Sequence, residues 1–263
     1  MSRMAILAQS MKSGSRDFAL MYTPTTWAFG WMTRVLAQVT FYSMMGALLG
    51  DSDRTRYLLI GAAVYIAVVE TMVTTAATTW ERVSGTLPLL IAAPAGLVLV
   101  FSGRSWYWAA TGTLSSSLSL LILAPLFGVS LTLTQAVIVI PLIFLVALST
   151  YGLALVCGSL AVRFHPWRNI ISNIVHLTML TLGGFLVPVL FWPTPLQWLA
   201  QVFPGTHGLA AIRTVLDSGS TGEALGYAAL ALLTGIAWAL VAMWSFWALA
   251  ASGRRTGNIE YGD

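Results

Sequence analysis

The chain has 263 residues, of which 57% are apolar and 8% are charged, with one cysteine and a formal net charge of +4. Soluble domains carry about 25% charged residues, whereas residues 105–162, 169–212 and 224–253 contain no Asp, Glu, Lys or Arg. These figures exclude disordered, collagen-like, nucleic-acid-binding and disulfide-rich secreted proteins, and they predict an all-α polytopic membrane protein with a single transmembrane domain over residues 1–263.

Residues 1–26 are too polar to cross a membrane, but they place apolar side chains such as Met4 and Leu7 at helical spacing. Basic residues such as Arg3 and Lys12 accompany them. This combination predicts a helix that lies in the cytoplasmic interface, attracted to anionic headgroups. A frayed basic tail is the alternative.

Six apolar segments are long enough to cross the membrane, with ends uncertain by two to four residues. They lie at about 28–49, 57–79, 105–127, 135–162, 170–191 and 225–250.

Lys and Arg concentrate on one side of this arrangement. The side that holds both termini carries Arg3, Lys12, Arg16, Arg82, Arg104, Arg163, Arg168, Arg254 and Arg255, and the other side carries Arg54, Arg56 and Arg213. We therefore expect both termini, including a tail at 251–263, to be cytoplasmic in a multi-pass protein of the cell membrane.

Polar side chains recur at helical spacing inside three of the predicted spans. They are Arg34, Gln38 and Tyr42 in the first span, Glu70 and Thr74 in the second, and Asn173 and His176 in the fifth. Such groups either join helices by hydrogen bonds or line a polar pathway. The sequence leaves both interpretations open.

Arg34 and Glu70 are expected at similar depths, about 10 and 13 Å from the cytoplasmic boundary. An isolated charge at such a depth is costly. We therefore predict a buried ion pair between them. The alternative is that Arg34 reaches the headgroups while Glu70 lines a pathway alone.

The cytoplasmic loop at 80–96 reads WERVSGTLPLLIAAPAG. It begins with Glu81 and Arg82, continues with apolar residues at helical spacing, and ends at Pro94 and Gly96. The pattern predicts a short amphipathic helix that presents charges and an apolar ridge to a soluble partner. The alternative is a helix that only rests on the membrane.

The outer segment at 192–218 is apolar but interrupted by prolines, including Pro193 and Pro204. The remaining pieces are too short to span, so they are predicted to be re-entrant or interfacial. Arg213 is expected to extend its stem toward the headgroups. An ordinary interfacial loop is the alternative.

The motif E-R-x-x-G-T-L-x-x-L, followed by a proline, resembles the coupling-helix signature of ABC exporter permeases of the type-2 superfamily. The matching residues are Glu81, Arg82, Gly85, Thr86 and Leu87. The outer pattern P…P-x-x-W/L…P…R, ending at Arg213, is similar to the same family. The resemblance implies that the loop docks on an ATP-binding subunit, and that the first, second and fifth spans surround the transport route.

The P-loop motif GxxxxGK[ST] is absent, because the only lysine is Lys12 and no glycine precedes it. We therefore expect no enzyme activity and no cofactor or metal in this chain, with ATP and Mg²⁺ bound by a separate ATP-binding subunit in two copies. The chain is expected to pair with a second permease chain, as a homodimer or a heterodimer, in the lipid bilayer and without nucleic acid.

The predicted function is export of an amphipathic small molecule, an antibiotic or a lipid-like compound by alternating access. The main alternative is a permease for a lipid-linked glycan of the O-antigen or teichoic-acid type. Remote alternatives are a channel, a scramblase or an intramembrane enzyme. The three histidines show no HExxH spacing, and no GxSxG motif occurs.

Overall fold

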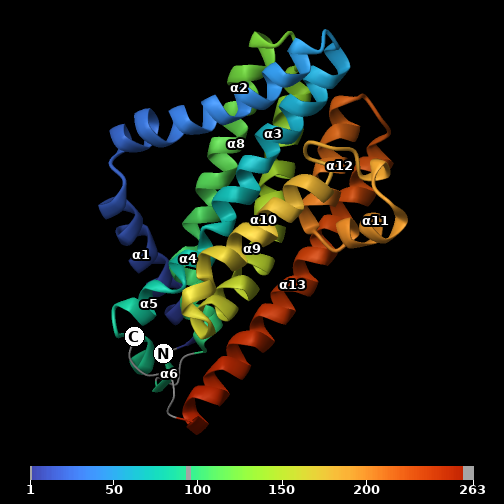
Figure 1. The fold of residues 1–263 in the computed structure, drawn as a ribbon. Helices are drawn as coiled ribbons and strands as arrows, with labels where there is room; N and C mark the ends of the chain where they lie inside the picture. The colour runs from blue at the N-terminus through green and yellow to red at the C-terminus, as the bar shows by residue number, and fades with distance from the viewer. Residues whose placement is uncertain (1, 93–95, 257–263) are drawn as a thin grey trace.

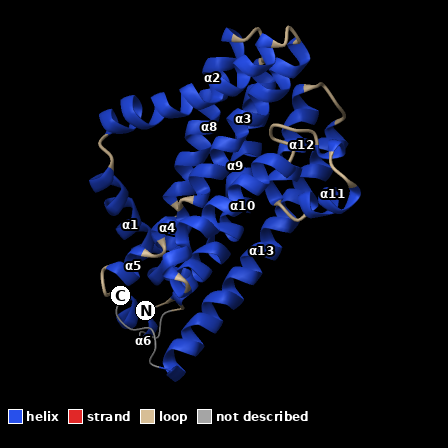
Figure 2. Ribbon diagram, in the orientation of Figure 1, coloured by secondary structure: helices blue, strands red, loops and turns tan. Residues whose placement is uncertain are grey.

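The computed structural model describes residues 2–92 and 96–256, with the side chains of 255 and 256 left undescribed. Within these ranges all regular secondary structure is helical, and loops join the helices (Figure 2). The predicted closing residue Pro94 and the tail residues 257–263 lie outside the described residues.

The N-terminal segment forms helix α1, Arg3–Met21. Its first turn is capped because the Ser2 hydroxyl accepts a hydrogen bond from the Ala5 amide at 3.2 Å. The helix runs against α7, Leu97–Ser105, and small residues permit the contact: a Cβ on Gly14 would lie 2.2 Å from the Arg104 carbonyl oxygen. The predicted helix within residues 1–26 is confirmed; its place at the membrane surface stays a prediction.

Among the residues that the structure describes, four helical stretches are long and apolar enough to cross a membrane, at 52–83, 97–126, 133–163 and 221–254. They correspond to the predicted second, third, fourth and sixth spans. In chain order they contain α3 (Ser52–Met72), α4 (Thr74–Ala77) and α5 (Trp80–Val83); α7 and α8 (Tyr107–Leu126); α9 (Leu133–Arg163); and α13 (Thr221–Thr256). The third begins at residue 97 rather than 105, because α7 precedes α8 in the same helical stretch, and the charge of Arg104 within it is paired with Asp17 and Glu81.

Neither the predicted first span nor the predicted fifth span is confirmed as a span among the described residues; the first is helical throughout most of its length, whereas the α-helix of the fifth, predicted at 170–191, ends at Leu182. A π-helical turn, η1 (Thr26–Trp31), leads into α2 (Met32–Leu48), and this helix carries the polar residues Arg34 and Gln38. Helix α10 (Arg168–Leu182) has 15 residues and is about 22 Å long. That length is less than the ~30 Å hydrocarbon layer.

The helices pack closely where small residues meet. On α9, a Cβ added to Gly152 would lie 2.8 Å from the Ala239 amide and 2.9 Å from the Gly235 carbonyl oxygen of α13. The α3 helix forms the centre of the bundle, since Leu59 and Val64 are fully buried. Small-residue contacts of this kind let membrane helices approach closely.

The short helices gather at opposite ends of the bundle (Figure 1). Helices α5 and α6 (Leu87–Ala92) lie near the start of α1 and the end of α13. Helices α11 (Thr194–Gln201) and α12 (Pro204–Leu216) lie toward the other end of α13, and the single-turn helices η2 (His165–Trp167) and η3 (Val189–Phe191) complete the fold. With eight and 13 residues, α11 and α12 are too short to span.

Candidate functional site

The loop predicted as one helix at 80–96 is two short helices, α5 and α6, joined by a turn. Gly85 adopts a positive φ of 70°, in the left-handed region that favours glycine. The Thr86 amide donates to the Glu81 carbonyl oxygen at 3.0 Å, which closes the turn after α5. The single-helix prediction is wrong because this glycine ends α5 and redirects the chain.

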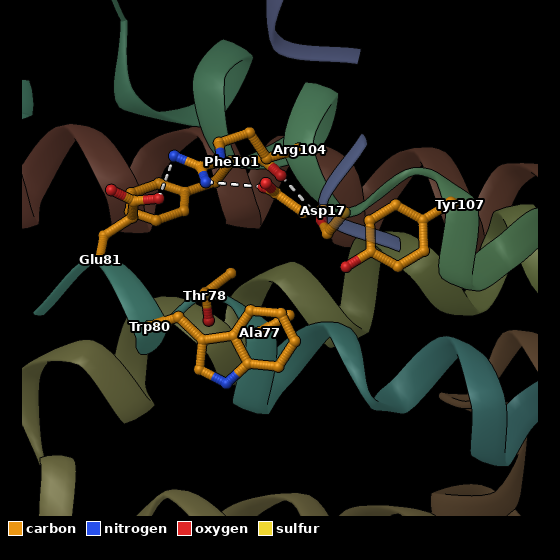
Figure 3. A pocket seen from close by; sticks show the side chains of 9 residues that line it. Asp17, Ala77, Thr78, Trp80, Glu81, Phe101, Arg104 and Tyr107 are labelled. Atoms are coloured by element: carbon orange, nitrogen blue, oxygen red, sulfur yellow. Dashed lines mark hydrogen bonds and ion pairs between the residues drawn. The ribbon is translucent and has the colours of Figure 1, made fainter. Parts of the chain in front are cut away.

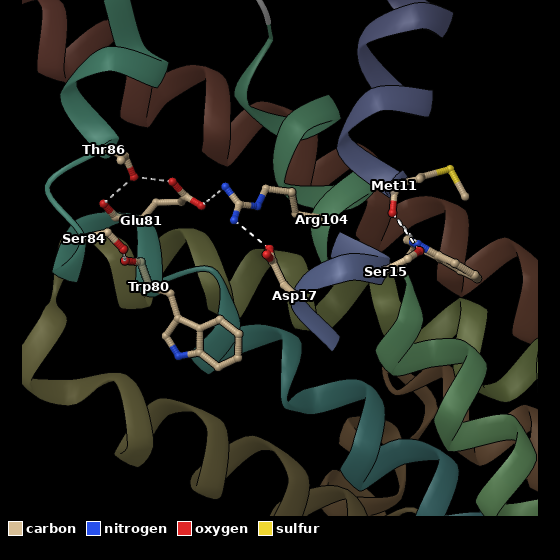
Figure 4. Close-up of polar contacts among 9 residues, drawn as sticks. Met11, Ser15, Asp17, Trp80, Glu81, Ser84, Thr86 and Arg104 are labelled. Atoms are coloured by element: carbon tan, nitrogen blue, oxygen red, sulfur yellow. Dashed lines mark hydrogen bonds and ion pairs between the residues drawn. The ribbon is translucent and has the colours of Figure 1, made fainter. Parts of the chain in front are cut away.

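The Glu81 side chain points toward Arg104 and Thr86 (Figure 4). Glu81 is only 6% exposed to solvent. The carboxylate forms an ion pair with Arg104 of α7 and accepts a hydrogen bond from the Thr86 hydroxyl. A buried carboxylate requires such partners, because an unpaired charge is costly to remove from water.

Arg104 also forms a 2.8 Å ion pair with Asp17 of α1 (Figure 3). We call Asp17, Glu81 and Arg104 the ion-pair cluster. These three residues enclose part of a cavity of about 20 Å³ next to Trp80 and Tyr107, which is room for about one water molecule. We call residues 80–92, which contain α5 and α6, the α5–α6 loop. The cluster joins the N-terminal helix, the α5–α6 loop and the start of the third candidate span.

Arg82 and Leu87 also face the fold. The Arg82 guanidinium donates to the Val162 carbonyl oxygen at 2.6 Å, near the end of α9. Leu87 is 1% exposed and packs in a cluster with Phe101 and Phe246. The motif residues thus hold the loop in place.

The exposed surface of residues 80–92 includes two large apolar side chains that lie outside the motif residues. Val83 is 69% exposed and Leu89 is 71% exposed. Ser84 and Gly85 are exposed as well. A partner that meets this loop would contact these residues first.

The predicted ion pair between Arg34 and Glu70 is wrong: the described residues form no salt bridge between them. Instead Trp31 lies between the two side chains. Its indole Nε1 donates to Glu70 Oε1 at 2.8 Å, and the Arg34 guanidinium lies 4.9 Å from the centroid of its ring. The indole supplies both a donor for the carboxylate and a π-face for the cation.

Glu70 is the most deeply buried charged side chain in this region, at 1% exposed. Thr74, one turn later, is also fully buried, and its hydroxyl has no hydrogen-bond partner among the described residues. Gln38 and Tyr42 lie half-buried on α2, where Tyr42 packs against the hydrophobic core. Several of the predicted polar residues are therefore buried by packing within this chain.

His176 joins α10 to α3. Its Nδ1 lies 2.8 Å from the Tyr65 hydroxyl, and its Nε2 lies 3.0 Å from Oδ1 of the exposed Asn173. The two predicted polar residues of α10 thus form one hydrogen-bonded chain with a tyrosine of the neighbouring helix.

Arg213 does not extend outward as predicted. Its guanidinium donates to the Gly184 carbonyl oxygen at 2.8 Å and lies 3.6 Å from the centroid of the Tyr57 ring. Burial lowers the pKa of Arg213, while Tyr57 acts in the opposite direction. Arginine nevertheless keeps its proton in proteins and remains a donor. Arg213 therefore binds carbonyl groups that the end of α10 leaves free.

The outer prolines begin the short helices. Pro193 immediately precedes α11, and its carbonyl oxygen accepts from the Leu196 amide at 2.9 Å. Pro204 occupies the first position of α12, where its missing amide hydrogen costs nothing.

Sequence reasoning missed three residues of these sites: Asp17, Trp31 and Arg104. Asp17 is the one acidic residue among the basic residues of the first 26. Arg104 follows the apolar run at 97–101 after a serine and a glycine, and its sequence position indicates only a basic residue at a membrane boundary. The expected location of Asp17 and Arg104 on the same side of the membrane was the sequence feature from which their ion pair could have been predicted.

Most of the chain matches a known protein family. The family model described as ABC-2 type transporter matches residues 13–216, which contain the ion-pair cluster, the loop and the outer helices. No curated protein and no solved structure matches the chain. Since the family match covers more than half of the chain, this protein belongs to the ABC-2 type transporter family and is a membrane permease component.

Proposed function

We propose that this chain is the permease subunit of an ATP-driven exporter and that the α5–α6 loop receives the motion of a separate ATP-binding subunit. The observation that carries the proposal is the construction of the loop. Its charged motif residues are fixed inward by Arg104 and by the Val162 carbonyl group, while Val83 and Leu89 remain exposed. A loop held in this way moves together with the helices to which it is bonded.

The route of the motion follows from the same contacts. A push on α5 would reach α3 through the continuous helical stretch 52–83, α7 through Arg104, and α9 through Arg82. Two ATP-binding subunits, which hold ATP and Mg²⁺, would act on two permease chains, whether identical or not. Different affinities of the two conformations for nucleotide would then drive alternating access.

The proposed orientation places the loop and both termini in the cytoplasm, and α11 and α12 outside. Single cysteines at the exposed positions Ser84 and Thr194, in a Cys157→Ala background, should react with an impermeant reagent from opposite sides of the membrane. Reaction of both from one side contradicts the orientation.

The proposed substrate is an amphipathic small molecule, an antibiotic or a lipid-like compound. The chain contains 11 Trp, 11 Phe and 10 Met residues, and such side chains suit apolar, adaptable binding surfaces. Lipid-linked glycans are the second substrate class, because aromatic rings also pack on sugars.

The test is ATP-dependent transport in inside-out vesicles that contain the chain and its ATP-binding subunit, with fluorescent amphiphiles and a lipid-linked glycan as separate substrates. We expect Val83→Asp and Leu89→Asp to reduce transport by at least ~10-fold, with insertion unchanged. Leu133→Asp is the matched control, since Leu133 is 83% exposed and begins α9, whereas the loop contacts Val162 near the other end of that helix. Full transport by both loop variants contradicts the proposal.

A further inference from the structure

A large groove that the proposed transport mechanism does not use lies between α1, α7, α9 and α13. Its volume is about 800 Å³, within the ~300–1,000 Å³ of typical ligand pockets. The wall is mainly apolar and includes Leu97, Leu155, Met243, Phe246 and Trp247.

The polar groups inside the groove are already bonded. The Tyr151 hydroxyl donates to the Ser102 carbonyl oxygen at 2.7 Å and lies 2.7 Å from the Ser105 hydroxyl. The Ser102 hydroxyl donates to the Leu99 carbonyl oxygen at 3.3 Å. The interior therefore offers an apolar surface to a ligand.

Arg3 and Arg254 give the groove a charged end. Both line the groove and both are exposed, and neither has an acidic partner among the residues that the structure describes. Arg254 uses its Nε to donate to the Ile91 carbonyl oxygen of α6 at 3.2 Å. Two guanidinium groups beside an apolar groove are complementary to an amphiphile with an anionic head.

The length of the groove matches an acyl chain. Along α13 it extends from Ala239 to Arg254, which is about 22 Å at 1.5 Å per residue. One leaflet of the hydrocarbon layer is about 15 Å thick. The groove can therefore hold a chain that starts at the arginines and runs along a candidate span toward the middle of the bilayer.

We propose that this groove binds an anionic phospholipid, with its phosphate between Arg3 and Arg254 and an acyl chain against Phe246 and Trp247. In the proposed orientation both arginines meet the cytoplasmic leaflet, whose anionic lipids attract basic side chains. The headgroup then lies beside the Arg254 contact to Ile91, so the bound lipid stabilises the α6 end of the loop.

The experiment uses the full chain, with any ATP-binding subunit that co-purifies, in detergent. Brominated phosphatidylglycerol and brominated phosphatidylcholine are titrated separately as quenchers of tryptophan fluorescence. The contribution of Trp247 is the fluorescence of the unmodified chain minus that of the Trp247→Phe variant. We expect phosphatidylglycerol to quench Trp247 at lower concentration than phosphatidylcholine. The Arg3→Gln/Arg254→Gln double variant should weaken its apparent affinity roughly 30-fold. Arg16→Gln, an exposed arginine of the same α1 helix that does not line the groove, should leave it unchanged.

Steric occlusion provides a second arm. Ala251→Phe should abolish quenching of Trp247, because residue 251 lines the groove, whereas Ala237→Phe on an exposed part of the same helix should not. Equal quenching by the two lipids, or quenching that Ala251→Phe leaves intact, overturns the proposal. The comparison of the two lipids needs no arginine variant, so it remains decisive if the double variant fails to fold.

Discussion

Individual residues of the recognised motif have structural roles that their charge alone did not reveal. Glu81 and Arg82 were expected to face a partner, but each is bonded within the chain. A charge on a cytoplasmic loop can bind a partner or fix the loop, and the sequence of the loop alone cannot distinguish the two. The decisive neighbours, Arg104 and Val162, are distant in sequence.

The ion-pair cluster gives a stability prediction. Arg104→Gln should lower the free energy of unfolding by about 2 kcal/mol, because the nearly buried Glu81 loses its counter-ion and the partial exposure of Arg104 tempers the cost. Thermal unfolding in detergent measures the effect. Adding Glu81→Gln to Arg104→Gln should restore part of the loss.

The control for this prediction is Arg54→Gln, since the pair of Arg54 with Asp51 is exposed, with side chains 64% and 38% accessible. Such surface pairs contribute about 0–1 kcal/mol. If both single variants unfold at the same temperature, the cluster has no special structural role.

Trp31 gives the second prediction at this scale. Trp31→Phe should cost about 1–3 kcal/mol, because it removes the indole donor of the buried Glu70. Arg34→Gln should cost less, since Arg34 is exposed and its guanidinium lies over the ring face of Trp31. A double-mutant cycle of Arg34→Gln and Glu70→Gln should show a coupling energy below about 1 kcal/mol, because Trp31 contacts both side chains and lies between them. A coupling above about 1 kcal/mol would restore the direct ion pair.

Among the secondary-structure elements, the apolar runs were the most predictable part. The residues of α9 were expected at 135–162 and form a helix from Leu133 to Arg163. The break between α5 and α6 was not predicted, because Gly85 can occupy a helix or a left-handed turn. The role of Arg213 was not predicted either. Its partner, the Gly184 carbonyl group, is available because α10 ends at Leu182, and the sequence does not specify that end.

The close contact of α9 and α13 gives a prediction at the scale of helices. A Cβ at Gly235 would lie 2.7 Å from the Ser149 Cα atom, so Gly235→Ala should force the helices apart and cost about 1–3 kcal/mol. Gly226→Ala on the same helix meets nothing within 4 Å and should be neutral or stabilising by up to ~1 kcal/mol. Thermal unfolding in detergent compares the stabilities of the two variants. Equal unfolding temperatures for Gly235→Ala and Gly226→Ala would contradict the close packing of α9 and α13.

For the whole molecule, composition predicted the membrane class because 8% charged residues cannot cover a soluble protein of this size. The number of spans was harder to predict. Arg34 and Gln38 make the helix at 26–48 less apolar, and α10 is short, so hydropathy does not decide whether either crosses the bilayer. Substrate identity was not predictable, because the aromatic and methionine residues suit several amphiphiles.

The central claim is that the α5–α6 loop meets an ATP-binding subunit. A photo-reactive amino acid at Val83, with Leu133 as the control position, tests it directly in native membranes. We predict that the Val83 position cross-links to a separate polypeptide that carries a GxxxxGK[ST] motif, identified by mass spectrometry, and that the Leu133 position does not. Cross-linking of Val83 only to lipid or to this chain itself would contradict the account.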